Sequence, residues 1–304
     1  MKQSGALVLS RWGMIAPFCA FLAACAQSPV PAGPAAHFQV SVVSLNPCTD
    51  AILAEVTTPG QLLAISHFSH DPAASSMEAV KAARFAETSG AVEEVAALAP
   101  DVVVASTFLD PATQQALRDM GMRVVMVPIP VDVATSEAQV RELADLAGNP
   151  DAGEALVARI ESALANAASP AEEKPVPALV WESGGIVSGD HTLIADLLRR
   201  SGFANAAAAR ELSQADYLPL ERMLAQPPRV IFTVGDARSQ GDRMLSHPAL
   251  DTLKGVARAP IDSALLWCGG PTIPRALKRL AQVRAAADQG QPAHFPNSVQ
   301  RGVR

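Results

Sequence analysis

Apolar runs of strand length alternate with segments of helical spacing along most of the chain, and this alternation occurs twice. The predicted elements of the first half are strands at 40–45, 62–66, 102–105 and 123–127 and helices at 50–55, 92–98 and 111–120. Those of the second half are strands at 178–181, 230–234 and 264–267 and helices at 193–201, 220–225 and 274–287. Two further helices, 136–147 and 151–168, lie between the halves. Because strands that alternate with helices form parallel sheets covered by helices, the sequence predicts an α/β protein with two lobes joined by a helical segment.

The N-terminus has the pattern of a lipoprotein export signal. Lys2 and Arg11 precede a 13-residue, mostly apolar run over residues 12–24, which ends in small residues before Cys25. Such a run is too short to span a bilayer, and a charged start followed by an apolar run and small residues is typical of a secretory signal. We expect cleavage before Cys25 and lipidation of its thiol. The alternative is an ordinary export signal that is cut after Ala26.

The charge of the chain outside this signal excludes nucleic acid as an expected partner. Removal of residues 1–24 leaves 22 basic and 30 acidic residues, a net charge of about −8. An anionic surface neither neutralises phosphates nor favours anionic lipids, so membrane attachment depends on the lipid on Cys25. We expect a monomer in the periplasm, anchored to a membrane. The expected domains are the signal peptide 1–24, a lipidated tether 25–38, an N-terminal lobe 39–135, a connecting helical segment 136–175, a C-terminal lobe 176–288 and a disordered tail 289–304.

Three segments resemble a known family. They are VVSLNP at 42–47, GAVEEV followed by LAPDVV within 90–103, and LIADLLRRSGFAN at 193–205. By these segments the chain from about 42 to 287 resembles the periplasmic substrate-binding proteins of ABC importers for vitamin B12, ferric siderophores and haem. The resemblance implies two Rossmann-like lobes joined by a single long rigid helix, with the ligand cleft between the lobes. It also implies an ABC permease and ATPase complex in the inner membrane as the partner.

Physical reasoning places a ligand at the carboxyl ends of the predicted strands. The loops that arrive there are 46–50, 67–70, 181–185 and 267–271. Outside the signal, both Trp residues and both Cys residues other than Cys25 lie in these loops. Aromatic faces at such a place suit a planar, largely apolar ligand, so we expect stacking from Phe68, Trp181 and Trp267. The alternative for the two Trp residues is that they are buried caps of their strands.

The resemblance adds further ligand contacts. Phe68 and Ile186 lie near positions that contact ligand in the family, and Tyr217 lies where the family often has another aromatic contact. The loops contain no dense Arg cluster, which departs from binders of highly anionic ferric siderophores.

Cys48 and Cys268 are expected to meet at the cleft from opposite lobes. The first interpretation is a disulfide, the bond that two such residues most often form in an oxidising compartment. A second interpretation is a soft metal site, in which the two thiolates and His67 or His70 coordinate copper, zinc, or an iron or cobalt ion carried by the ligand. A third is two free thiols. Glu182 could complete a metal site, orient a ligand amide or be an ordinary surface carboxylate.

Glu93 and Glu221 each lie near the start of a predicted helix, one in each lobe. A carboxylate there interacts favourably with the helix dipole, which is a sufficient reason for its presence. In the family that the chain resembles, a carboxylate at this place on each lobe docks with Arg pockets of the permease. By resemblance, Glu93 and Glu221 are therefore the predicted docking residues.

The sequence thus predicts a binding protein without catalytic residues or a cofactor. Its expected ligand is a cobalt or iron chelate, first a corrinoid such as vitamin B12, with a ferric siderophore, haem or a soft metal as alternatives. A thiol-dependent envelope enzyme, built on Ser183 or on Cys48 with His67, is the alternative from another class. The chain contains no G-x-S-x-G or C-x-x-C motif that would support it.

Overall fold

The structure is a computed structural model that describes residues 39–72, 74–170, 172–235 and 242–289. The predicted signal peptide and tether, and the predicted tail from residue 290 on, lie outside the described residues. Among the described residues, no helix is both long enough and apolar enough to cross a membrane.

The N-terminal lobe is built on a parallel sheet with the strand order β3-β2-β1-β4-β5. Its strands are β1 (Val42–Ser44), β2 (Leu62–Ser66), β3 (Ala86–Thr88), β4 (Val102–Ser106) and β5 (Arg123–Val127). Its helices are α1 (Pro47–Val56), α2 (Ala79–Ala82), α3 (Val92–Leu98) and α4 (Pro111–Asp119), with a 3₁₀ turn η1 (His67–His70) after β2. The predicted strands and helices of this lobe are confirmed. The short edge strand β3 has two exposed residues and therefore gave no apolar run to predict it.

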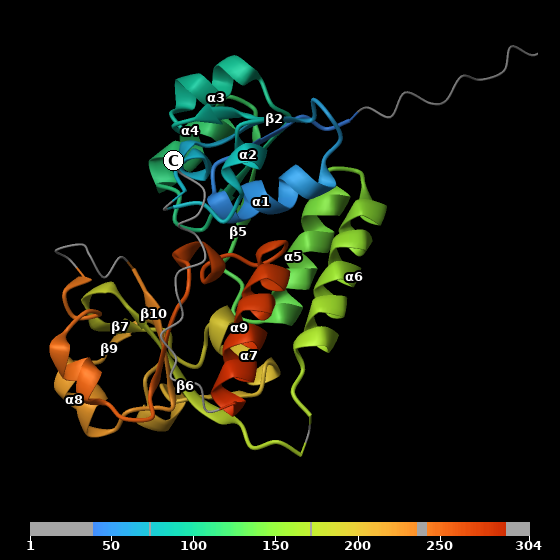
Figure 1. The fold of residues 1–304 in the computed structure, drawn as a ribbon. Coiled ribbons are helices and arrows are strands. Elements are labelled where there is room, and N and C mark those ends of the chain that lie inside the picture. The colour runs from blue at the N-terminus through green and yellow to red at the C-terminus, as the bar shows by residue number, and fades with distance from the viewer. Residues whose placement is uncertain (1–38, 73, 171, 236–241, 290–304) are drawn as a thin grey trace, which may run out of the picture. The chain divides into compact units, whose positions relative to one another are not determined.

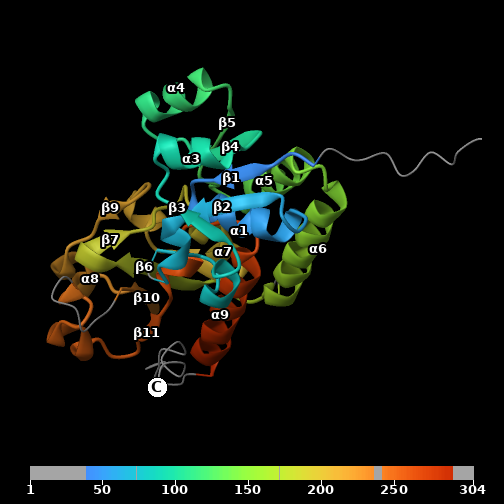
Figure 2. The same cartoon turned by 90° about the horizontal axis from the view of Figure 1, so that it is seen from above.

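Helices cover both faces of this sheet. Side chains alternate between the two faces along each buried strand, so both faces present apolar groups for helices to cover. Val42 and Val104 pack in one cluster with Ile52 of α1, whereas Val43 packs in another with Val95 of α3. Figure 2 shows α3 and α4 on the opposite side of the strands from α1. Strands buried on both faces read as continuous apolar runs, which is why the sequence predicted them.

The C-terminal lobe has a mixed sheet with the order β11-β10-β6-β7-β9, and β8 also pairs with β6. Its strands are β6 (Val176–Glu182), β7 (Ile186–Val187), β8 (Phe203–Asn205), β9 (Asp216–Tyr217), β10 (Val230–Val234) and β11 (Ala257–Pro260). Its helices are α7 (Leu193–Arg200), α8 (Leu220–Ala225) and α9 (Thr272–Asp288). Its 3₁₀ turns are η2 (Ser183–Gly185), η3 (Ala208–Arg210), η5 (Pro248–Thr252) and η6 (Ser263–Leu265).

One predicted strand of this lobe is wrong. The segment 264–267 lies partly in the 3₁₀ turn η6, where the Asp262 side chain accepts a hydrogen bond from the Ala264 backbone N–H. The edge strand is β11 instead, in parallel register with β10. Arg258 and Pro260 interrupt its apolar pattern, and an edge strand tolerates a proline because one side of it needs no partner.

Two helices connect the lobes, α5 (Val133–Leu146) and α6 (Pro150–Ala167), where the resemblance implied a single one. Asp132 caps α5 through the Thr135 backbone N–H, and the left-handed Gly148 forms the turn between the helices. Figure 1 shows α5, α6, α7 and α9 as a layer of neighbouring helices, in agreement with their contacts. One apolar core runs from Ile52 of α1 through this layer to Val180 of β6, so the two lobes share packed side chains.

Candidate functional site

A pocket of about 250 Å³ lies between the lobes at the carboxyl ends of the strands. Loops after β4 and β5 form its N-terminal wall, and the end of β6, the start of α7 and the segment after η6 form its C-terminal wall. Its lining residues are Phe108, Ile129, Pro130, Val131, Glu182, Ser188, His191, Thr192, Leu193, Ile194, Gln214, Ala215, Leu266 and Trp267. This is the edge at which the sequence predicted a ligand. The volume of the pocket is slightly below the range of small-molecule pockets, about 300–1,000 Å³.

The pocket presents two exposed aromatic side chains, one from each lobe. Trp267 is 53% exposed and Phe108 is 77% exposed, although both are large apolar groups. Ile129 and Val131, in the loop after β5, are exposed in the same pocket. Apolar side chains gathered at a concave surface mark a place where a ligand is buried, so this pocket is the candidate binding site.

Glu182 is the acidic side chain of the pocket and lies at the end of β6. It is buried, and its Oε1 accepts a hydrogen bond from Ser188 Oγ at 2.8 Å. Burial raises the pKa of Glu182, and the hydrogen bond from Ser188 opposes this rise. Among the described residues that line the pocket there is no Lys or Arg, so neither lobe supplies a cation for an anionic ligand.

Ser188 and His191 reach the pocket from the turn before α7. Gly189 allows this turn to lie against Ser213, because a Cβ on residue 189 would overlap the Ser213 carbonyl. Thr192 then caps α7 by accepting a hydrogen bond from the Ala195 backbone N–H. His191 is exposed and lies on the pocket wall.

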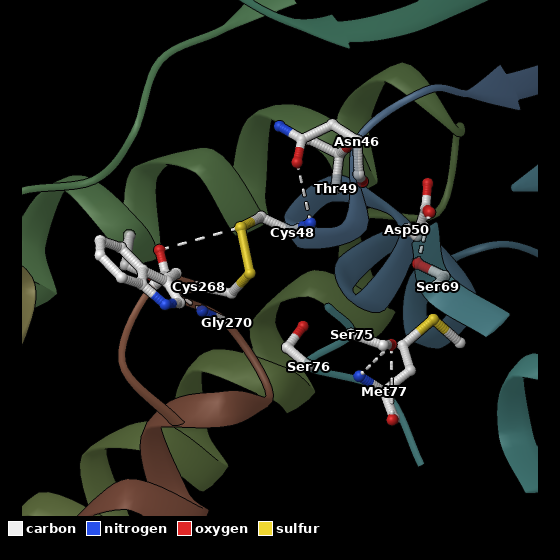
Figure 3. The surroundings of a disulfide bond; sticks show 12 residues. Asn46, Cys48, Thr49, Asp50, Ser69, Ser75, Ser76, Met77, Cys268 and Gly270 are labelled. Atoms are coloured by element: carbon white, nitrogen blue, oxygen red, sulfur yellow. Dashed lines mark hydrogen bonds between the residues drawn. A yellow bond between two sulfur atoms is a disulfide. The ribbon is translucent and has the colours of Figure 1, made fainter. Parts of the chain in front are cut away.

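The structure joins Cys48 and Cys268 in a disulfide across 220 residues of sequence, with their Cα atoms 4.9 Å apart. Figure 3 shows the bond between the first turn of α1 and the segment before α9. The first of the three interpretations of these cysteines, a disulfide, is therefore confirmed. The predicted thiolate metal site is therefore wrong for this state, since neither sulfur is a free thiolate. In the described part of the chain no group of His, Cys, Asp and Glu side chains is arranged to hold a metal ion.

Trp181 is a correction to the predicted ligand contacts. Its side chain is 0% exposed, packs with Leu179 and Val187, and donates a hydrogen bond from Nε1 to the Leu218 carbonyl at 3.3 Å. The physical reason is that successive side chains of β6 point to opposite faces of the sheet. Trp181 lies on the face covered by α8, whereas Glu182, the next residue and the last of the strand, reaches the pocket. The alternative interpretation, a buried strand cap, is the one observed.

The η1 turn carries the other predicted contacts of the N-terminal lobe. Phe68 is half-exposed, its ring centroid lies 4.0 Å from that of His67, and His67 Nδ1 lies 3.3 Å from the Thr88 carbonyl. His70 Nε2 is buried without a hydrogen-bond partner among the described residues. None of these side chains lines the pocket described above, so their assignment as ligand contacts stays a prediction.

Asp50 of α1 anchors the η1 turn through side-chain hydrogen bonds. Its Oδ2 accepts hydrogen bonds from the Ser66 backbone N–H at 3.0 Å and from Ser69 Oγ at 2.6 Å. Burial raises the pKa of Asp50 to about 8. The sequence interpretation missed this residue, because its role depends on a loop that follows it by 16 positions.

Ile186 and Tyr217 pair with each other across the antiparallel strands β7 and β9. Tyr217 is 55% exposed, but neither residue lines the pocket. Glu93 and Glu221 lie in the first turns of α3 and α8 and are both exposed, one in each lobe. Their predicted docking role stays a prediction.

Phe108, Val131 and His191 are pocket residues that the sequence interpretation missed. Phe108 and Val131 follow predicted strands, so the rule that selected the loops after β1 and β2 could also have selected theirs. His191 gave no such signal, since its place depends on how the turn before α7 folds back onto Ser213.

The two-lobed architecture and its cleft are those of a solute-binding protein, and comparison with known proteins agrees. A family described as periplasmic binding protein matches residues 42–258. The chain therefore belongs to the periplasmic binding protein family, whose members act as substrate-binding components of ABC importers.

Solved structures similar to this chain share its fold. The periplasmic haem-binding protein RhuT from Roseiflexus sp. RS-1 is 20% identical, with a TM-score of 0.61 over 83% of this chain and 100% of that one. The haem-binding protein HutB of Vibrio cholerae is 16% identical, with a TM-score of 0.67 over 81% and 98%. CeuE of Helicobacter pylori is 18% identical, with a TM-score of 0.64 over 83% and 85%. No match was found among curated protein sequences.

Proposed function

We propose that this protein captures a metal-containing macrocycle, first a corrinoid such as vitamin B12, and delivers it to an ABC permease. The observation that carries this proposal is the pocket in which Phe108 and Trp267 present apolar faces from opposite lobes. A flat macrocycle between them would cover both rings, and large aromatic side chains gain the most from such burial. Binding, rather than catalysis, is then the whole of its chemistry.

The charge of the pocket favours a neutral ligand over an anionic one. Its described lining has no Lys or Arg, and its acidic group, Glu182, is buried. Ferric siderophores and the propionates of haem carry negative charge, which cations at the site would normally offset. A corrinoid with amide side chains needs no such cations, and Glu182 would accept a hydrogen bond from an amide N–H of the ligand.

Haem is the second candidate, and a specific observation supports it. His191 is exposed on the pocket wall, and a neutral imidazole is a common ligand of haem iron. RhuT and HutB, which share this fold, are haem-binding proteins.

The proposal includes the place of the protein and its partner. The lipid on Cys25 would hold it at a membrane in the periplasm, and Glu93 and Glu221 would dock on the permease of an inner-membrane complex with its ATPase. Their positions in the first turns of α3 and α8, one in each lobe, support this arrangement.

Calorimetric titration of the detergent-purified protein with cyanocobalamin and with haemin tests the ligand. A dissociation constant of about 1 μM or lower, about −8 kcal/mol, is expected for cyanocobalamin. Trp267→Ala should weaken binding about 10- to 100-fold, because an aromatic side chain contributes roughly 1.5–3 kcal/mol on burial. Met120→Ala is the control, since Met120 is about as exposed as Trp267 and lies outside the pocket.

The two ligands give different outcomes. Tight binding of haemin that is lost in His191→Ala, with no heat from cyanocobalamin, would replace the corrinoid by haem. No heat from either ligand would overturn the proposal of a macrocycle. An equal loss of affinity in the Met120→Ala control would remove the pocket as the binding site.

A further inference from the structure

We propose that the Cys48–Cys268 disulfide positions Trp267 for ligand capture, so that its reduction by a dithiol weakens binding in the cleft. This inference rests on the proposed function. It concerns how the site is held in shape, and it makes ligand affinity depend on the redox state of the two cysteines.

Trp267 is adjacent in the chain to one end of the disulfide. Cys268 directly follows Trp267, and the disulfide attaches it to α1 of the opposite lobe. Cys48 Sγ lies 3.8 Å from the Trp267 carbonyl oxygen, and since a disulfide sulfur carries no hydrogen this is a packing contact. Figure 3 shows Cys48 bonded to Cys268 beside the first turn of α1. The half-exposed indole thus stands next to a covalent attachment.

The other end of the disulfide, Cys48, lies in a fixed part of the fold. Cys48 lies in the first turn of α1, where its backbone N–H donates a hydrogen bond to Asn46 Oδ1 at 3.0 Å. Behind this turn, Ile52 packs in the core shared by the two lobes. A bond to Cys48 therefore ties the Trp267 segment to a rigid part of the N-terminal lobe.

The segment that contains Trp267 has other attachments on either side of it. After Cys268, the Gly270 backbone N–H donates to Ser136 Oγ at 2.8 Å. Gly270 is also left-handed and lies so close to Ile52 that a Cβ there would be 2.6 Å from it. Before Trp267, Asp262 caps η6. These contacts fix the two ends of the segment, whereas the disulfide is the attachment next to Trp267.

Reduction is chemically accessible from one side. Cys48 is half-buried, whereas Cys268 is only 6% exposed, so the thiolate of a dithiol reductant would attack the Cys48 sulfur and release Cys268 as the thiolate. The second thiol of the reductant then displaces Cys48. Two electrons and two protons pass to the protein, which ends with two thiols, and the dithiol ends as a disulfide.

The η1 turn provides an internal comparison. Phe68 lies in a segment held by Asp50 through Ser66 and Ser69, and this anchor does not involve the disulfide. Reduction should therefore loosen the segment around Trp267 and leave the η1 turn unchanged.

The test measures segment order and affinity separately on the full protein. Amide hydrogen exchange is followed in the oxidised protein, in the dithiothreitol-reduced protein and in Cys48→Ser/Cys268→Ser. Exchange should become faster at residues 262–271 in the last two and stay unchanged at 67–70. Titration with cyanocobalamin and haemin, on the same samples, should give about tenfold weaker binding without the disulfide, which corresponds to about 1.4 kcal/mol and to the cost of ordering one or two side chains.

Each outcome of these measurements either supports or overturns the inference. Equal affinity of the oxidised and reduced protein for a probe that binds would overturn the inference, as would unchanged exchange at 262–271. If neither probe binds in any state, the proposed function fails, and the exchange rates alone decide whether the disulfide holds the Trp267 segment. The double Ser variant must also be insensitive to dithiothreitol; a response there would assign the effect to another site.

Discussion

Asp50 is buried beneath the η1 turn with no ion-pair partner among the described residues, and Asp50→Asn tests what this carboxyl does to stability. Oδ2 accepts hydrogen bonds from Ser66 and Ser69, whereas Oδ1 is buried without a partner in the described structure. Burial raises the pKa of Asp50 from 3.8 to about 8, against the hydrogen bonds from Ser44, Ser69 and Ser66 that lower it. The native state thus holds this proton at neutral pH.

The sign of the pH dependence follows from proton linkage. Between pH 3.8 and about pH 8 the unfolded chain has released the Asp50 proton while the folded chain retains it. The folded state binds more protons in this window, so the free energy of unfolding falls as the pH rises. A pKa difference of about 4, at 1.36 kcal/mol for each pKa unit, gives a loss on the order of 5 kcal/mol across the window.

Urea unfolding of the wild type and of Asp50→Asn, at several pH values from 4.5 to 8.5, measures this loss. Asn keeps an oxygen that accepts the hydrogen bonds from Ser66 and Ser69 but does not titrate, so the variant should lack the Asp50 part of the pH slope. Asp119→Asn, on an exposed position of α4, is the control and should retain the wild-type slope. Identical slopes for Asp50→Asn and the wild type would refute the reasoning.

Three further predictions concern the disulfide, the docking residues and the anchor. Cys48→Ser/Cys268→Ser should lower the free energy of unfolding by about 2–4 kcal/mol, because the bond closes a long loop in the unfolded chain; equal urea midpoints with and without the bond would contradict this. Glu93→Ala/Glu221→Ala should abolish ligand transport into cells and leave the dissociation constant unchanged, and a matching loss of affinity would count against docking. Cys25→Ser should move the protein from the membrane fraction to the soluble periplasmic fraction, whereas continued membrane attachment would show that the lipid is not the anchor.

Regular elements were predictable where their signal is local. The strand 62–66 and the helix 92–98 have the bounds that the sequence predicted, because each carries its apolar spacing within a few residues. The short strands β7, β8 and β9 were missed, since two or three residues carry no periodic pattern and such strands form by pairing with distant ones. β11 was missed because Arg258 and Pro260 break its pattern.

Part of the candidate site was also predictable. Trp267 lines the pocket as expected, but it follows the η6 turn and not a strand at 264–267. Glu182 lines it at the end of β6, where the carboxyl ends of parallel strands meet at one edge. Trp181 satisfied the same rule and is nevertheless buried, since strand period and the α8 layer decide which face a side chain takes. One residue of offset separates a core tryptophan from a pocket carboxyl.

The α/β class, the two lobes, the edge at which the cleft lies and the pair of cysteines that could meet there were all predictable from the sequence. These follow from local apolar periodicity and from the chemistry of rare residues, which do not depend on the rest of the fold. Three other features became known from the folded chain: the bond between Cys48 and Cys268, the places of Phe108 and His191 in the pocket wall, and the burial of Asp50 beneath η1. Those facts depend on contacts between segments far apart in the chain, whose distance and burial are set when the sheets and helices pack together.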